Sequence, residues 1–105
     1  MSTASLKDKI PPHNLEAEQA TLGAMLLDWD AVGLVIGHLR PDRFYSLQHQ
    51  TIYKAILSLY NKGQRGDILT LTDELRITGQ LDAAGGVAYV ASLPDHVPTS
   101  SDVEY

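Results

Sequence analysis

The four histidines of this 105-residue chain have the widest chemical range, because imidazole can ligate metals and carry protons near neutral pH. They stand in four separate segments, at His13, His38, His49 and His96. No two are spaced as a pair on one expected helix, so a zinc site would have to be assembled by the fold alone. His49 lies within an apolar helical arc, where an imidazole must be neutral or hydrogen-bonded, and we expect a core histidine whose hydrogen bonds are satisfied.

The acidic residues give no paired site for acid–base chemistry. Glu16 and Glu18 are two residues apart on an expected helix, so their carboxylates point to different sides. Asp28 and Asp30 stand at the start of the next expected helix, where a capping role accounts for both.

Two glycine-containing motifs resemble functional sites, but the rest of the sequence does not support either function. Gly85–Gly86 is not followed by the lysine of a phosphate-binding loop and is expected to form a turn. Arg65-Gly66-Asp67 matches a cell-adhesion tripeptide, but no secretion signal accompanies it. The sequence therefore predicts no catalytic, metal-binding or cofactor-binding residue.

The composition favours a folded protein of the cytoplasm. Eight Lys and Arg against 13 Asp and Glu leave a net charge of −5, which opposes binding to DNA phosphates. The absence of Cys excludes disulfides, thiolate zinc sites and cysteine nucleophiles. No apolar run approaches the roughly 18 residues of a membrane span, and residues 1–12 lack a signal peptide's hydrophobic stretch.

Helical periodicity and end signals predict an all-α domain, a compact orthogonal bundle of about six short helices without a sheet. The expected helices cover residues 15–27, about 30–39, 41–45, 47–62, 70–78 and 87–93. Asn14, Ser46 and Thr70 are the expected N-caps, with Asp73 completing a capping-box-like pair with Thr70. Segment 87–93 could also form a strand, but the chain offers no second strand to pair with it.

The expected helix 15–27 has two apolar faces, which implies a central position. One face is built from small residues, so a neighbouring backbone can approach closely at Gly23. The full set of expected core residues is Leu22, Gly23, Leu26, Trp29, Phe44, His49, Ile52, Tyr53, Ile56, Tyr60 and Leu75.

The chain divides into three parts by composition and breaker residues. Residues 1–11 are expected to form a flexible tail, residues 12–97 the helical domain, and residues 98–105 the start of a further helix. On the apolar segment 87–93, the side chains of Val87, Ala88 and Ala91 face away from the expected core. Two alternatives remain open for them: a protein interface, or cover by a neighbouring segment.

Several short motifs, in order, resemble a known family. They are residues 12–19 (PHNLEAEQ) with Leu22–Gly23, then Phe44–Tyr45, His49 with Ile52–Tyr53, residues 67–71 (DILTL) with Leu75, Gly79 and Leu81, and residues 85–90 (GGVAYV) with Leu93. This set closely resembles the N-terminal domain of bacterial replicative DNA helicases of the DnaB family, from about Pro12 to Tyr105.

The sequence departs from the family pattern at two places. Arg65 and Gly66 stand where the family often has Pro and a β-branched residue, which predicts a looser loop. Asp102 stands where Asn is common, and the chain stops as the next helix begins.

The resemblance implies a mainly helical collar domain on one side of a hexameric ring. Such a domain supports assembly with other copies of itself and helps to present the surface that primase and the helicase loader engage. In the family a helical hairpin that pairs subunits, a linker and a RecA-like motor follow, so residues 98–105 would begin that hairpin. ATP, Mg²⁺ and the single-stranded DNA in the ring belong to that motor, and no catalytic residue can be assigned to this chain.

Two functions from different classes follow for this chain. The first is a non-catalytic assembly and docking domain of a replicative helicase. The alternative is a small helix-turn-helix domain that binds nucleic acid, since several short helices with tight turns could hold one. Charge opposes the alternative, because the longest expected helix carries only Lys54 and Lys62.

Overall fold

The computed structural model of the chain describes residues 14–98. The expected tail (1–11), His13, Asp102 and all but the first residue of the expected hairpin start lie outside this range. Within it the elements are α2 (Leu15–Leu27), α3 (Asp30–Val35), the 3₁₀ turn η1 (Pro41–Arg43), α4 (Leu47–Asn61), α5 (Ile68–Ile77), α6 (Gly86–Ser92) and the 3₁₀ turn η2 (Leu93–His96). The described residues form no strand, so the prediction of an all-α fold is confirmed.

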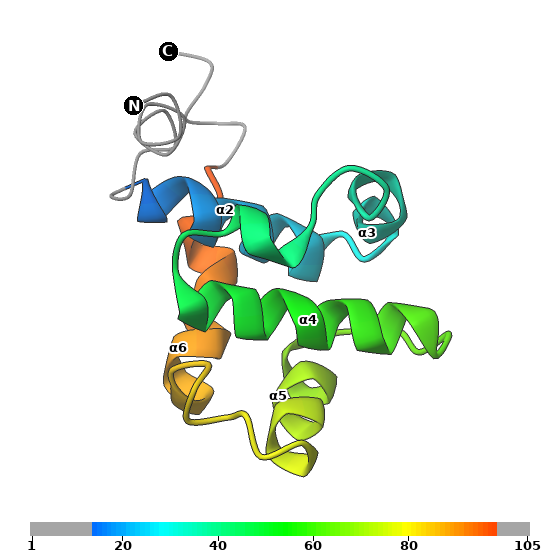
Figure 1. Cartoon of the computed structure of the whole chain (residues 1–105), viewed down its shortest axis with the longest axis vertical. Coiled ribbons are helices and arrows are strands. Elements are labelled where there is room, and N and C mark those ends of the chain that lie inside the picture. Colours follow the sequence, from blue (N-terminus) through cyan, green and yellow to red (C-terminus); the bar gives the residue numbers. More distant parts are fainter. Residues whose placement is uncertain (1–13, 99–105) are drawn as a thin grey trace, which may run out of the picture.

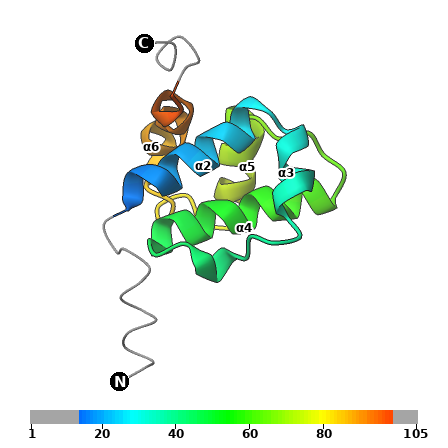
Figure 2. The same ribbon diagram turned by 90° about the horizontal axis from the view of Figure 1, so that it is seen from above.

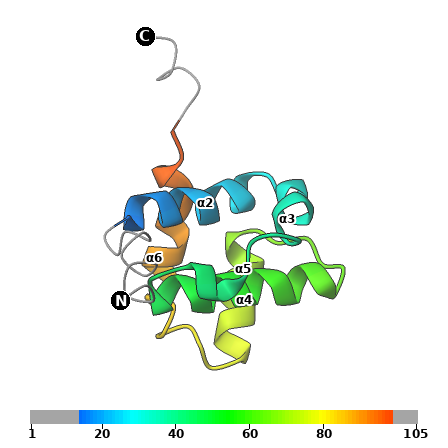
Figure 3. The ribbon, with the colours of Figure 1, turned by 45° about the horizontal axis from the view of Figure 1, so that its top comes forward.

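The helix α4 runs through the middle of the molecule (Figure 1). Helix α2 packs on one side of it, and α5 crosses it steeply on the other (Figures 1 and 2). Helix α6 continues into η2, and η2 packs against α2 (Figures 1 and 3). Elements that are distant in the sequence therefore close the bundle.

One apolar face of α4 forms the centre of the core. The buried residues of this helix are His49, Ile52, Tyr53, Ala55, Ile56 and Leu59. Of the other expected core residues, Leu22, Gly23, Trp29, Phe44 and Leu75 are buried, and Leu26 is partly buried against the cluster. The interpretation of Tyr60 as a core residue is wrong: it is 37% exposed, because its ring lies at the edge of the core beside Trp29, with 6.3 Å between the ring centroids.

Gly23 lies where the backbones of α2 and η2 approach each other closely. A β-carbon at this position would collide with the carbonyl group of Leu93, in η2, and would touch the side chain of Val97. The absence of a side chain at Gly23 thus lets α2 and η2 pack backbone to backbone. The sequence-based expectation of a tight contact at this glycine is confirmed.

Of the three expected N-caps, the structure confirms one. Ser46 caps α4 as expected, since its hydroxyl accepts a hydrogen bond from the backbone N–H of His49. The Asn14 side chain makes no capping bond to α2. Thr70 is not the cap of α5 either: the Asp67 carboxylate accepts from the Thr70 N–H at 2.8 Å, so the N-cap lies three residues earlier than predicted and the helix begins at Ile68.

The second expected helix is shorter than its periodicity indicated. Helix α3 ends at Val35, and a turn containing Gly37 follows, because glycine is a weak helix former. Neither Asp28 nor Asp30 caps it by a side-chain bond; its N-cap is Trp29. The connector after α3 is held by the buried Tyr53, whose hydroxyl donates to the Leu39 carbonyl at 2.6 Å.

The loop before α5 is closely packed at Gly66, one of the residues that depart from the family pattern. Gly66 is buried, and a β-carbon there would collide with the indole ring of Trp29. The backbone N–H of Gln64 also donates to the Leu59 carbonyl at 3.0 Å. Gly66 therefore serves close packing against Trp29, which offsets the looseness expected from its sequence.

The contact at Gly23 gives a stability prediction. We expect Gly23→Ala to lower the free energy of unfolding by about 1–3 kcal/mol, because the new methyl group overpacks the seam between α2 and η2. The matched control is Gly37→Ala, since a β-carbon at Gly37 meets no atom within 4 Å. Urea denaturation of both variants measures the difference, and equal stabilities would contradict the prediction.

Candidate functional site

Three helices meet at a buried polar network centred on His49. The imidazole is 1% exposed, and both of its ring nitrogens have partners. Nδ1 lies 2.7 Å from Oε1 of Glu18, in α2, and Nε2 lies 2.6 Å from the hydroxyl of Tyr89, in α6. We call these three residues the His49 network.

The carboxylate of Glu18 also fixes the backbone that leads into α4. One oxygen accepts a hydrogen bond from the Tyr45 N–H at 2.7 Å, and the other accepts a longer one from the Ser46 N–H at 3.4 Å. Only 14% of the Glu18 side chain is exposed. A single carboxylate therefore joins α2 to the connector before α4 and to the histidine one turn inside α4.

The hydrogen bonds of the network have one direction that is fixed by chemistry. The Glu18 carboxylate can only accept, so Nδ1 of His49 donates to it, and Nε2 shares a hydrogen bond with the Tyr89 hydroxyl. The Gln19 amide donates to that hydroxyl oxygen at 3.0 Å. The imidazole and phenol rings are also stacked, with centroids 5.9 Å apart and planes inclined by 17°.

The network resembles an acid–histidine arrangement of enzymes, but its geometry serves packing. In enzymes of that kind the histidine faces a nucleophile or a substrate, whereas both nitrogens of His49 face Glu18 and Tyr89. Every buried side-chain nitrogen and oxygen of residues 14–98 has a hydrogen-bond partner. His49 thus has the hydrogen-bonded core position that its place in the sequence predicts.

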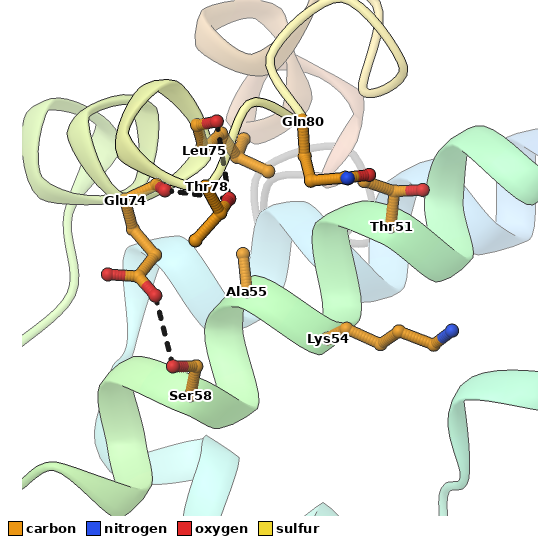
Figure 4. Close-up of a pocket in the computed structure, with 8 residues that line it drawn as sticks. All are labelled: Thr51, Lys54, Ala55, Ser58, Glu74, Leu75, Thr78 and Gln80. Atoms are coloured by element: carbon orange, nitrogen blue, oxygen red, sulfur yellow. Dashed lines mark hydrogen bonds between the residues drawn. The ribbon is translucent and has the colours of Figure 1, made fainter.

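A second polar cluster lies in a cleft of about 360 Å³ between α4 and α5 (Figure 4). Glu74 is 8% exposed and accepts hydrogen bonds from Ser58 at 3.0 Å and from the Lys62 ammonium at 3.0 Å. The bond from Lys62, with help from Ser58, holds the pKa of the Glu74 carboxyl below its ordinary value. Lys54 and Gln80 stand at other parts of the cleft, which Ala55 and Leu75 line with apolar atoms.

The other candidate residues do not gather into a reactive cluster. Glu16, Asp28 and Asp30 are exposed, and so are His38 and His96. Among the described residues no three histidine or acidic side chains are placed to hold a metal ion. Gly85 and Gly86 both have positive φ, 103° and 89°, and form the turn that begins α6.

The residues expected to face away from the core lie on the outer side of α6. Val87 is 47% exposed, and Ala88 and Ala91 are also exposed. No segment among residues 14–98 covers them. Whether they form a protein interface stays a prediction.

The sequence analysis missed the partners of His49. The sequence indicates only that Glu18 does not pair with Glu16, and Tyr89 enters only as part of residues 85–90. Their one common signal is that each belongs to a motif shared with the DnaB family: residues 12–19, the segment around His49, and residues 85–90. Three motifs that are far apart in the sequence thus meet at one place.

These features define a small helical domain whose buried polar groups join helices to one another. Comparison with known proteins then identifies the family. The family model for the DnaB-like helicase N-terminal domain matches residues 10–105. The chain belongs to this family.

Individual relatives agree with the family assignment. The chain is 53% identical to the replicative DNA helicase DnaB of Treponema pallidum (strain Nichols) over 103 residues, 98% of this chain and 24% of that protein. It is 44% identical to the replicative DNA helicase DnaC of Bacillus subtilis (strain 168), again over 98% of this chain and 23% of that protein. The chain thus spans about a quarter of the length of these relatives.

A solved structure has the same fold. The crystal structure of the N-terminal domain of DnaB helicase from Mycobacterium tuberculosis matches with a TM-score of 0.79 and 44% identity, over 90% of this chain and 68% of that one. The assignment replaces the helix-turn-helix alternative, which the family match does not support. None of the helices formed by residues 14–98 is long and apolar enough to cross a membrane.

Removing one hydroxyl tests the His49 network. Tyr89→Phe leaves Nε2 of His49 and the Gln19 amide without their partner, so we expect a loss of about 1–3 kcal/mol in unfolding free energy. Tyr45→Phe is the matched control, because Tyr45 is 58% exposed and its hydroxyl bonds to no other described residue. Chemical denaturation should leave the control within about 0.5 kcal/mol of the parent. A similar result for both variants would count against the network.

The Glu74 pair gives a pH-dependent stability. Its pKa is lower in the folded than in the unfolded state, so its stabilisation is fully present above the ordinary value of 4.5 and is lost as the pH falls through the folded-state pKa. We expect Glu74→Gln to be less stable than the parent at neutral pH, with the difference shrinking below about pH 4.

A second variant separates this pair from general acid denaturation. Lys62→Gln removes the same interaction from the other side and should give a similar pH profile. Thermal melts between neutral pH and about pH 3 measure both variants. A stability difference that does not change over this range would refute the role assigned to the Glu74–Lys62 pair.

Proposed function

We propose that this domain is the N-terminal collar of a hexameric replicative DNA helicase and acts through protein contacts during DNA replication. The observation that carries the proposal is its family membership, at 53% identity to a replicative helicase over nearly the whole chain. The domain supports assembly of the ring and presents a docking surface for primase and the helicase loader. It works in the cytoplasm.

The chemistry of the helicase belongs to another part of the protein. The chain corresponds to about a quarter of its relatives' length. We place ATP hydrolysis with Mg²⁺ and movement along single-stranded DNA in a motor domain outside these residues, as the family resemblance implies. The polar groups of residues 14–98 support this division, because those that are buried bond to one another. The domain itself is proposed to bind no cofactor and to catalyse no reaction.

The outer face of α6 is the proposed contact surface. Val87, Ala88 and Ala91 place apolar atoms in solvent side by side on one short helix. Apolar surface of this kind gains free energy when a partner covers it. The partner is another copy of the protein, or primase.

A charge on this face tests the proposal. We expect Val87→Asp to weaken self-association or primase binding about tenfold or more, because the partner would have to bury a carboxylate. Far-UV circular dichroism should show unchanged helicity. Leu34→Asp is the matched control, since Leu34 is 74% exposed on α3, on another element.

Sedimentation and a primase pull-down measure both associations. If Val87→Asp matches the parent protein in both, the α6 face is not the contact surface. If Leu34→Asp weakens binding equally, the effect comes from added negative charge rather than from this face.

A further inference from the structure

The outer side of α5 carries four exposed residues in one stripe. Leu69 is 78% exposed and Ile77 is 74% exposed, although both are large aliphatic side chains. Asp73 and Arg76 are exposed between them. On a helix with 3.6 residues per turn, these four positions fall within about 100° of the circumference. We call Leu69, Asp73, Arg76 and Ile77 the α5 stripe.

The rest of the described chain leaves the α5 stripe in solvent. The opposite face of α5 is the buried one, with Leu71 and Leu75 in the core and Glu74 bonded to Ser58 of α4. In Figure 1, α5 lies at the lower edge of the bundle, whereas α2 and η2, which hold the two ends of the described range, lie toward the upper edge. A partner that covers both aliphatic side chains would therefore remove from water apolar surface that the fold leaves exposed.

We propose that the α5 stripe packs against the α5 stripe of a second copy of this chain, with the two helices antiparallel. A two-fold axis then passes near Asp73, and each surface meets an identical one. Leu69 and Ile77 each stand four residues from Asp73, which is about 6 Å along the helix. Leu69 of either copy therefore meets Ile77 of the other, and both apolar contacts form at once.

Charge complementarity favours a second copy as the occupant. Within one chain the Asp73 carboxylate and the Arg76 guanidinium lie 3.6 Å apart, so the stripe carries one charge of each sign. In the antiparallel pair, Arg76 of each copy is only about 4.5 Å along the helix from Asp73 of the other, and the two aspartates at the axis lie between two arginines. A parallel pair would instead set the two Arg76 side chains side by side.

The length of α5 limits the strength of this contact. The helix has 10 residues, so a pair of them buries less than the roughly 1,600 Å² of a standard interface. Separate chains therefore pair weakly, and copies that are tethered in one assembly pair more completely, because tethering raises their effective concentration.

The α5 stripe is a different surface from the outer face of α6. The proposal does not depend on the contact suggested for α6, and a copy that uses both surfaces can touch two neighbours at once. Cross-linking through α5 is accordingly expected to be unchanged in Val87→Asp, which separates the two proposals experimentally.

Disulfide cross-linking tests the pairing directly. The chain has no cysteine, so one introduced thiol reports on one surface. Asp73→Cys in the 105-residue chain, oxidised mildly at high protein concentration, should form a disulfide-linked dimer. Leu34→Cys, which is exposed on α3, is the control and should stay mostly monomeric. Equal dimer yields from the two variants would overturn the proposal.

Two further thiol variants test the direction of the helices. When Leu69→Cys and Ile77→Cys are mixed, they should cross-link to each other more than either does to itself. Preferential linkage of each variant to itself would show a parallel pair, and the antiparallel arrangement would be wrong.

A charge swap tests the complementarity. Asp73→Arg should weaken self-association about tenfold in sedimentation equilibrium, because two arginines of each copy then face two of the other. Asp73→Arg combined with Arg76→Asp restores one charge of each sign and should recover the association. If the double variant melts like the parent but does not associate like it, the proposal is wrong.

The same variants distinguish a different occupant. If the parent chain is monomeric at the highest concentration and Asp73→Arg weakens primase binding instead, the α5 stripe is the site of another protein, and pairing between copies is refuted.

Discussion

The requirement that a buried imidazole be hydrogen-bonded at both nitrogens organises this domain. His49 lies inside the core, so leaving either nitrogen unpaired would cost free energy comparable to a lost core contact. Glu18 and Tyr89 meet that requirement from α2 and α6, and Glu18 also holds the backbone that leads into α4. The first, middle and last helices of the described chain are thus joined by one set of directional bonds, around which the apolar side chains pack.

Much of the fold follows from local sequence. The bounds of α2, and those of α4 to within one residue, follow from the spacing of apolar residues and from the Ser46 cap, since these signals act within a few positions. The partners of His49 do not follow in this way. Glu18 is 31 residues from it and Tyr89 is 40, and pairing at such separations depends on how helices pack rather than on any local pattern.

The wrong predictions for the N-cap of α5 and for Tyr60 also arise because packing between elements is not visible in the local sequence. Thr70 and Asp67 are both acceptable caps, and the choice of Asp67 depends on the loop that packs Gly66 under Trp29. Tyr60 has the periodicity of a core residue, but the core ends beside it. The motifs of the family resemblance contain the residues that meet at His49, but neither they nor the periodicity shows that these residues pair.

The backbone contact between Gly23 and Leu93 also ties the two ends of the described chain together. Because η2 packs directly against α2, tension applied at residue 98 would act on this contact and reach α2 without passing through α3, α4 and α5. A domain closed in this way holds its last element by contacts to its first.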